Sequence, residues 1–260
     1  MNINDVLGKK KTVIGMIHLK ELPIGSKSES LNEVYEAAKH DLLALESGNA
    51  DAAIVENFFN QPYSDNVERT TLIAYVNILT KLKEIANIPL GVNLQYTSDT
   101  EEMEVATICN ASFIRSETFV ETRGGSYGIL YPQAPKVMNY KNQSQSDVLV
   151  FADINVKHTF PVFDQPIEYS IHEAIQAGAD ALILTGMETG KSPTVEDAKK
   201  FKEIAGDQPI YIGSGVQESN INDFLKFADG VIVGSSIKED GKIDRPIDKE
   251  KVKKLVASIN

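Results

Sequence analysis

"PIYIGSG" at residues 209–215 and "GVIVGSS" at residues 230–236 share one pattern, a short run of mostly apolar, β-branched residues that ends in glycine and serine. Continuous apolar runs of this length are typical of strands that are buried on both faces of a parallel sheet. Glycine lets the backbone approach an anion closely, and unpaired N–H groups can then bind it. The two runs therefore predict two strands whose ends hold an anion such as phosphate.

Runs of the same kind recur along the whole chain, and amphipathic helical patterns with a 3–4 spacing lie between them. Strict alternation without a linker predicts an α/β fold in which residues 1–260 form a single (β/α)8 TIM barrel. A doubly wound sheet is the alternative fold, and it would need fewer strands and a switch point. The predicted strands are residues 12–19, 52–57, 89–95, 112–117, 148–158, 181–186, 209–215 and 230–236.

One connection is much longer than the others. Residues 118–147 contain three glycines, two prolines and several aromatic residues between two predicted strands. Loops of this length in compact domains are usually functional. We therefore expect a mobile lid in this segment, followed by a helix, with a tolerated surface insertion as the alternative.

Composition limits the partners. The 260 residues include 26 Lys and Arg against 37 Asp and Glu, which gives a net charge of −11 and argues against nucleic acid as a partner. No apolar run approaches the roughly 18 residues of a membrane span, and the amino-terminal charges are not ordered as in a signal peptide. We expect a cytoplasmic protein that binds a phosphorylated small molecule. The sequence leaves open whether the protein forms a homo-oligomer. A single cysteine, Cys109, excludes an intramolecular disulfide.

The glycine and serine ends follow the seventh and eighth predicted strands. In (β/α)8 barrels the loops after these two strands commonly form a phosphate site. Ordinary turn chemistry is the alternative reading of a single such end, but two copies in these places favour phosphate binding. The predicted phosphate-binding residues are Gly213, Ser214, Gly215, Gly234, Ser235 and Ser236.

Several segments resemble a known family. "VIGMIHLKELP" (13–23), "ADINVKHTFPV" (152–162), "IGSGVQESN" (212–220) and "ADGVIVGSSIK" (228–238) are similar to those of the BtpA/SgcQ family, in the expected order. The last two also resemble the phosphate-binding ends of ribulose-phosphate-binding barrels, including the tryptophan synthase α-subunit. The resemblance implies a TIM barrel, phosphate binding, and a link to photosystem assembly in photosynthetic members.

Side chains on a strand alternate between its two faces, which predicts the residues inside the barrel. In "FADINVKH" (151–158) the apolar residues must pack on the helices, so Asp153, Asn155 and Lys157 are expected to point inward, with Asp153 and Lys157 in ion-pair reach. His158 has the opposite parity and is expected to pack against a helix. The same rule sends His18, Asn93, Gln95, Arg115 and Glu117 inward. The second strand is ambiguous, and we favour its face with Glu56 as the inward one.

Charged groups inside a barrel are costly unless they are paired, so their gathering near one mouth indicates function. A carboxylate near a lysine in a closed site can acquire a pKa suited to acid/base catalysis. We assign catalytic roles to Glu56, Asp153 and Lys157, and substrate binding to His18, Asn93, Arg115, Asn155 and Thr185. The resemblance supports Glu56, because the tryptophan synthase α-subunit has a catalytic glutamate in a similar strand-two setting.

Each role has a structural alternative. Arg115 with Glu117 or Glu56 could be a structural ion pair, Lys157 could be the counter-ion of Asp153, and His18 could be a core histidine with satisfied hydrogen bonds. A divalent metal on Glu56, Asp153 and His18 is a further alternative, but no tight ligand spacing supports it, so no cofactor is expected.

The leading hypothesis is an enzyme that acts on a phosphorylated sugar or phosphoribosyl-type compound at the carboxyl mouth of the barrel, as an isomerase, a lyase or a related enzyme. The alternative is a non-catalytic assembly or regulatory factor that has kept the barrel. Nucleotide hydrolysis is disfavoured, since the sequence has no G-x-x-x-x-G-K-[ST] loop.

Overall fold

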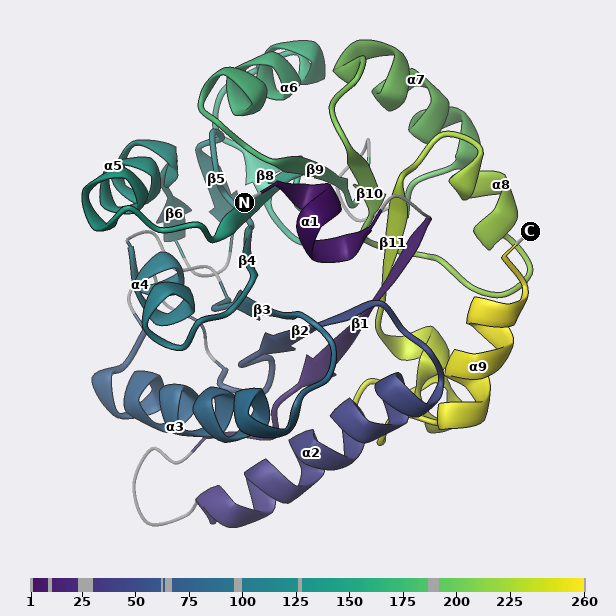
Figure 1. Cartoon of the computed structure of the whole chain (residues 1–260). Helices are drawn as coiled ribbons and strands as arrows, with labels where there is room; N and C mark the ends of the chain where they lie inside the picture. The colour runs from purple at the N-terminus through teal and green to yellow at the C-terminus, as the bar shows by residue number, and fades with distance from the viewer. Residues whose placement is uncertain are drawn as a thin grey trace.

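The computed structural model describes residues 2–8, 11–22, 30–61, 63, 67–95, 100–125, 128–186 and 192–259. At its centre is a closed parallel barrel with the strand order β1-β11-β10-β9-β7-β4-β3-β2 (Figure 1). Every barrel strand lies within one of the predicted apolar runs, so the predicted (β/α)8 fold is confirmed and the doubly wound sheet is wrong. The barrel strands are β1 (Thr12–His18), β2 (Ala52–Glu56), β3 (Leu90–Asn93), β4 (Phe113–Ser116), β7 (Leu149–Ile154), β9 (Ala181–Leu184), β10 (Ile210–Ile212) and β11 (Gly230–Val233).

A helix follows each barrel strand and covers the outside of the barrel (Figure 1). Two of these helices begin with a capping box, in which Ser30 and Thr194 each accept a bond from the backbone N–H three residues later. Within the described ranges, no helix has both the length and the apolar character needed to cross a membrane. The helices around the barrel are α2 (Leu31–Ser47), α3 (Arg69–Ile85), α4 (Glu101–Ile108), α5 (Ala134–Ser144), α6 (Ile167–Gln176), α7 (Val195–Ala205), α8 (Ile221–Leu225) and α9 (Lys249–Ala257).

Side-chain alternation along the strands produces two apolar cores. Val13 belongs to the core between the barrel and its helices, whereas its neighbour Ile14 belongs to the core inside the barrel. Phe113, Phe151 and Tyr211 fill the barrel interior, with successive ring centroids 4.8 and 5.0 Å apart. The polar inward residues come later in the strands, so they lie above this packed interior at the carboxyl end.

A short helix at the amino terminus, α1 (Ile3–Leu7), covers the opposite end of the barrel. Figure 1 shows α1 lying across the middle of the ring of strands. Leu7 is buried in the core inside the barrel, and Ile3 and Val6 pack against the same core. This helix was not predicted from the sequence, and it covers the amino end, opposite the carboxyl mouth.

The long connection after β4 contributes two strands to a small antiparallel sheet, and the segment after β7 contributes the third. Its strands β5 (Arg123–Gly125), β6 (Gly128–Leu130) and β8 (Phe160–Pro161) have the order β6-β5-β8. Arg123 and Leu130 are paired neighbours on its buried face. Residues 126 and 127 of the expected lid (118–147) lie outside the described residues, and movement of the lid stays a prediction.

We expect Gly91→Ala to destabilise the barrel. A Cβ at residue 91 would lie 2.3 Å from Phe113 Cε2, and the Phe113 ring cannot withdraw because it is buried against Phe151. Overpacking of this kind costs about 1–3 kcal/mol of unfolding free energy, which urea denaturation would measure. Gly124→Ala is the control, since its Cβ would meet Val162 at an ordinary 3.5 Å. Equal stability of the two variants would contradict this account of the interior.

Candidate functional site

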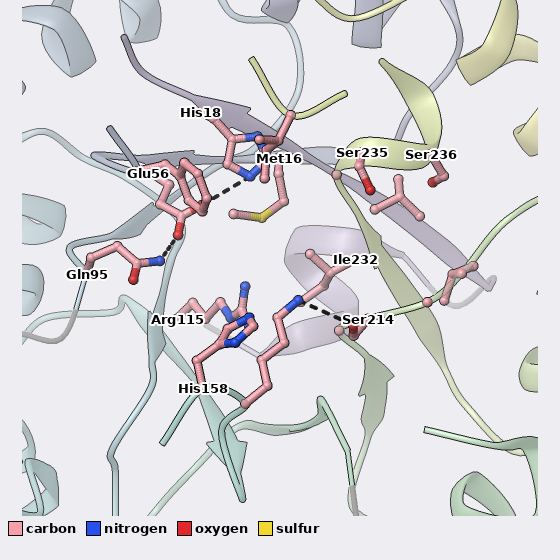
Figure 2. A pocket seen from close by; sticks show the side chains of 18 of the residues that line it. Met16, His18, Glu56, Gln95, Arg115, His158, Ser214, Ile232, Ser235 and Ser236 are labelled. Atoms are coloured by element: carbon pink, nitrogen blue, oxygen red, sulfur yellow. Dashed lines mark hydrogen bonds and ion pairs between the residues drawn. The ribbon is translucent and has the colours of Figure 1, made fainter. Parts of the chain in front are cut away.

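A cavity of about 640 Å³ lies at the carboxyl ends of the barrel strands (Figure 2). Its walls come from strand ends and from the loops that follow them, so residues far apart in the sequence meet there. All the predicted phosphate-binding residues line it, together with four other residues predicted for the site. Those residues are Gly213, Ser214, Gly215, Gly234, Ser235, Ser236, His18, Glu56, Arg115 and Lys157.

The glycines of the loop after β10 are required by the packing around them. A Cβ at residue 213 would lie 2.6 Å from Ile183 Cγ2. Gly215 has a φ of +74°, which side-chain-bearing residues rarely adopt, and a Cβ there would lie 2.9 Å from Ser192 Cβ. This loop lines the cavity, although the backbone N–H of Gly213 already donates to the Leu184 carbonyl oxygen at 2.9 Å.

Arg115 and Asp153 form a buried ion pair across the neighbouring strands β4 and β7. Arg115 donates from Nε to Asp153 Oδ2 at 2.8 Å and from Nη2 to Oδ1 at 3.1 Å. Burial alone would lower the pKa of Arg115, but Asp153 outweighs this effect and the pKa of Arg115 is raised. The guanidinium therefore keeps its positive charge, and Asp153 is its hydrogen-bonded partner.

The expected ion pair between Asp153 and Lys157 is wrong. Lys157 Nζ instead lies 3.3 Å from Ser214 Oγ, in the loop after β10 (Figure 2). Strand β7 ends at Ile154, and Asn155 has a positive φ of 54°, so side-chain alternation does not continue as far as Lys157. The ammonium group is thereby placed at the predicted phosphate loop rather than beside the carboxylate.

The expectation from side-chain alternation is also wrong for His158. It was expected to pack against a helix, but it lines the cavity beside Lys157 (Figure 2). Its own φ of 67° shows that residues 155–158 form an irregular turn rather than a strand.

His18 and Glu56 meet where β1 and β2 end. His18 Nε2 lies 3.3 Å from Glu56 Oε2, and Gln95 Nε2 donates a hydrogen bond to Glu56 Oε1 (Figure 2). Burial, and then the negative charge of Glu117, raise the pKa of Glu56 to about 8. Burial, and then the positive charges of Lys238 and Arg115, lower the pKa of His18 well below its ordinary value. At pH 7 the imidazole is therefore neutral and the carboxyl group carries a proton.

Three residues predicted to bind substrate do not line this cavity. Asn93 is buried and donates from Nδ2 to Glu102 Oε1 and to the Arg115 carbonyl oxygen, both at 3.2 Å. Thr185 is also fully buried. Asn155 lies at a smaller, second cavity and donates from Nδ2 to the Gly186 carbonyl oxygen at 3.0 Å. Asn93 and Thr185 therefore lie in the floor of the site rather than on its surface.

Other residues at the cavity were not assigned a role from the sequence. Gln95 and Glu117 were expected to point inward from the alternation of side chains along their strands, and this alternation was the available signal for them. Several more come from irregular loops, where no periodicity exists to reveal them; they are Phe58, Gln61, Tyr63, Gly241 and Ile243.

The described residues contain no cluster of three or more His, Cys, Asp or Glu side chains that could hold a metal ion. The set considered from the sequence was Glu56, Asp153 and His18. Asp153 pairs with Arg115, and the raised pKa of Glu56 keeps that carboxyl group protonated at pH 7. These donors are therefore not arranged as a metal site.

We expect the Glu56 carboxyl group to titrate with a midpoint near pH 8, because burial favours its neutral form. A ¹³C NMR titration of the glutamate carboxyl signals would measure this midpoint, with Glu56→Gln used to assign the resonance. Glu33 is the internal control, since its hydrogen bonds to Ser30 lower the pKa of its exposed carboxyl group. A Glu56 midpoint between pH 4 and 5 would contradict the neutral pair.

The pKa shift of Glu56 also fixes how stability depends on pH. The folded protein holds this proton above the pH at which the unfolded chain loses it, so Glu56 reduces stability as pH rises from about 4.5 to 8. Glu56→Gln does not have this titrating group. The difference between its unfolding free energy and that of the natural protein should therefore shift in favour of the variant as pH rises through this range, as measured by urea denaturation at each pH.

Proteins of similar sequence span almost the same length. An uncharacterized protein of Methanocaldococcus jannaschii is 33% identical over 255 residues, which cover 97% of this chain and 96% of that protein. The Photosystem I biogenesis protein BtpA of Synechocystis is 32% identical, with 95% and 87% covered. The putative sgc region protein SgcQ of Escherichia coli is 26% identical, with 99% and 97% covered.

Among solved structures, Mycobacterium tuberculosis tryptophan synthase has a TM-score of 0.64 at 13% identity, over 96% of this chain and 93% of that one. At this identity the likeness concerns the barrel fold alone. The BtpA family model matches residues 9–260, which include every strand of the barrel and every residue of the cavity. The resemblance noted in the sequence is thus confirmed, and the chain belongs to the BtpA family.

Proposed function

We propose that the protein is a cytoplasmic enzyme that acts on a phosphorylated sugar or phosphoribosyl-type compound by acid/base chemistry. The observation that carries this proposal is the buried Glu56 carboxyl group, which contacts His18 and Gln95 in the same cavity as the glycine- and serine-rich loops after β10 and β11. One wall offers groups that bind an anion, and another offers a transferable proton at neutral pH.

At the phosphate wall, Lys157 supplies positive charge to the loop that contains Ser214. Burial, and then the charge of Arg115, lower the pKa of Lys157, so a bound anion would stabilise its charged form. The overall charge of −11 opposes anion binding only weakly, because salt screens distant charges over roughly 8–10 Å whereas direct contacts act at about 3 Å. We therefore assign Lys157 to phosphate binding rather than to proton transfer.

At the other wall, Glu56 is the general acid. Its carboxyl proton passes to a substrate oxygen as that oxygen gains electron density, and the carboxylate then takes up a proton from the substrate. Gln95 and His18 hold both carboxyl oxygens in place during this exchange. A pKa of about 8 suits both directions near neutral pH, since proton transfer is most effective when the catalytic pKa is close to the operating pH.

A second candidate function is a non-catalytic assembly factor. It is favoured by the name of the Synechocystis relative, a photosystem I biogenesis protein that is 32% identical to this chain. Such a factor could keep the phosphate loops while losing the chemistry, so binding and turnover must be measured separately.

For binding, we expect Ser235→Asp to weaken the affinity for inorganic phosphate by about tenfold or more, because it adds a fixed negative charge beside the phosphate loops. Isothermal titration calorimetry would measure the affinity. Ser235→Asn is the matched control, with the same shape and no charge, and should bind phosphate within about threefold of the natural protein. Equal binding by both variants would place the phosphate site elsewhere.

For turnover, a panel of phosphorylated aldoses, ketoses and phosphoribosyl compounds would be incubated with the protein in D₂O and analysed by mass spectrometry. We expect deuterium to enter at least one compound, and Glu56→Gln to slow this exchange by about 10²–10⁴-fold while phosphate still binds. Phosphate binding without exchange of any compound would favour the assembly factor. Undiminished exchange by Glu56→Gln would remove Glu56 from the mechanism.

A further inference from the structure

A second cavity, of about 240 Å³, lies beneath the small antiparallel sheet. Residues 155–159 form the turn between it and the main cavity. Val156, Lys157 and His158 line the main cavity, whereas Asn155 lines the second one. The second cavity is therefore a separate site, and the proposal made for it does not rest on the function proposed for the main cavity.

Two charged residues, Arg123 and Glu121, line this cavity, and Arg123 is only 2% exposed. Its Nε donates to Thr159 Oγ1 at 2.8 Å, and its Nη2 donates to the carbonyl oxygens of Thr159 at 3.1 Å and Val156 at 3.4 Å. In the described part of the chain, its Nη1 makes no hydrogen bond, and its one ion pair is with Glu121 Oε2 at 3.7 Å. Two N–H donors of a buried guanidinium are thus left without an acceptor at hydrogen-bond distance.

Glu121 neutralises the positive charge of Arg123 only in part, because both of its carboxylate oxygens accept hydrogen bonds from other groups. Its Oε2 accepts from the Asn155 backbone N–H, and its Oε1 accepts from the Ser170 hydroxyl, both at 2.8 Å. Burial accordingly lowers the pKa of Arg123, and Glu121 offsets this only in part. A carboxylate that accepts from these two N–H donors of Arg123 would complete the hydrogen bonding of the guanidinium.

The rest of the lining limits what that anion can be. Pro161, Phe163 and Ile167 provide apolar walls. The volume corresponds to about eight water molecules at roughly 30 Å³ each, which suits a small organic acid. We propose that the second cavity binds a small carboxylate with an apolar body, its oxygens on Arg123 Nη1 and its body against Phe163.

The test uses benzoate as the probe and benzamide as its neutral counterpart of the same shape. Backbone amide NMR spectra of the full-length protein would follow each titration. We expect benzoate to shift the signals of residues 121–123, 155, 163, 165 and 167. We expect benzamide to bind about tenfold more weakly or not at all, because it lacks the charge that the guanidinium recognises. Equal binding of the two compounds would overturn the proposal, as would shifts at residues 213–215 and 234–236 alone, or no shifts.

Variants separate the two parts of the site. Arg123→Lys keeps the charge but loses the planar pair of donors, and should weaken benzoate binding by about tenfold. Phe163→Ala removes an apolar wall without touching the buried guanidinium, so it should weaken binding similarly even if Arg123→Lys fails to fold. Phe160→Ala is the matched control, since Phe160 is 64% exposed, as is Phe163, but does not line the cavity. Unchanged affinity in Phe163→Ala, or an equal loss in Phe160→Ala, would contradict the assigned binding mode.

Discussion

The buried ion pair between Arg115 and Asp153 constrains the charged groups that surround it in the main cavity. It joins β4 to β7 by two hydrogen bonds, at a depth where an unpaired ion would be strongly destabilising. Because Asp153 is committed to Arg115, it is not the partner of Lys157, which is left for the loop after β10. The positive charge of Arg115 also helps to keep His18 neutral by lowering the pKa of the imidazole.

Burial raises the cost of ionising each of the remaining groups, and it does so to a different extent for each one. Glu56 is close to Arg115 and Lys157, which favour its carboxylate form, yet burial and Glu117 outweigh them and its pKa rises to about 8. Because Glu56 is protonated and His18 is neutral, this buried pair retains the carboxyl proton of Glu56 without a net charge. Strongly perturbed carboxyl groups of this kind are concentrated at catalytic sites, since burial provides the shifted pKa that acid/base catalysis requires.

The small antiparallel sheet connects the long insertion after β4 to the segment that follows β7. Arg123 of β5 donates to Val156 and Thr159, and so holds both sides of the turn that carries Lys157 and His158 into the main cavity. An anion on the free side of the Arg123 guanidinium would act on the same side chain. The turn thus provides a direct covalent and hydrogen-bonded route between the two cavities.

The sequence by itself determined the barrel, because apolar runs of strand length and helical periodicity are local patterns. It also placed His18 and Arg115 inside, since alternation holds wherever the strand continues, whereas it left the facing of Glu56 on the second strand ambiguous. The tertiary structure alone decided the arrangement beyond the strand ends. Positive φ angles at Asn155 and His158 redirect Lys157 and His158, and they depend on no periodic signal. The partner of Asp153 and the pKa of Glu56 likewise depend on distances between strands, which the order of residues does not contain.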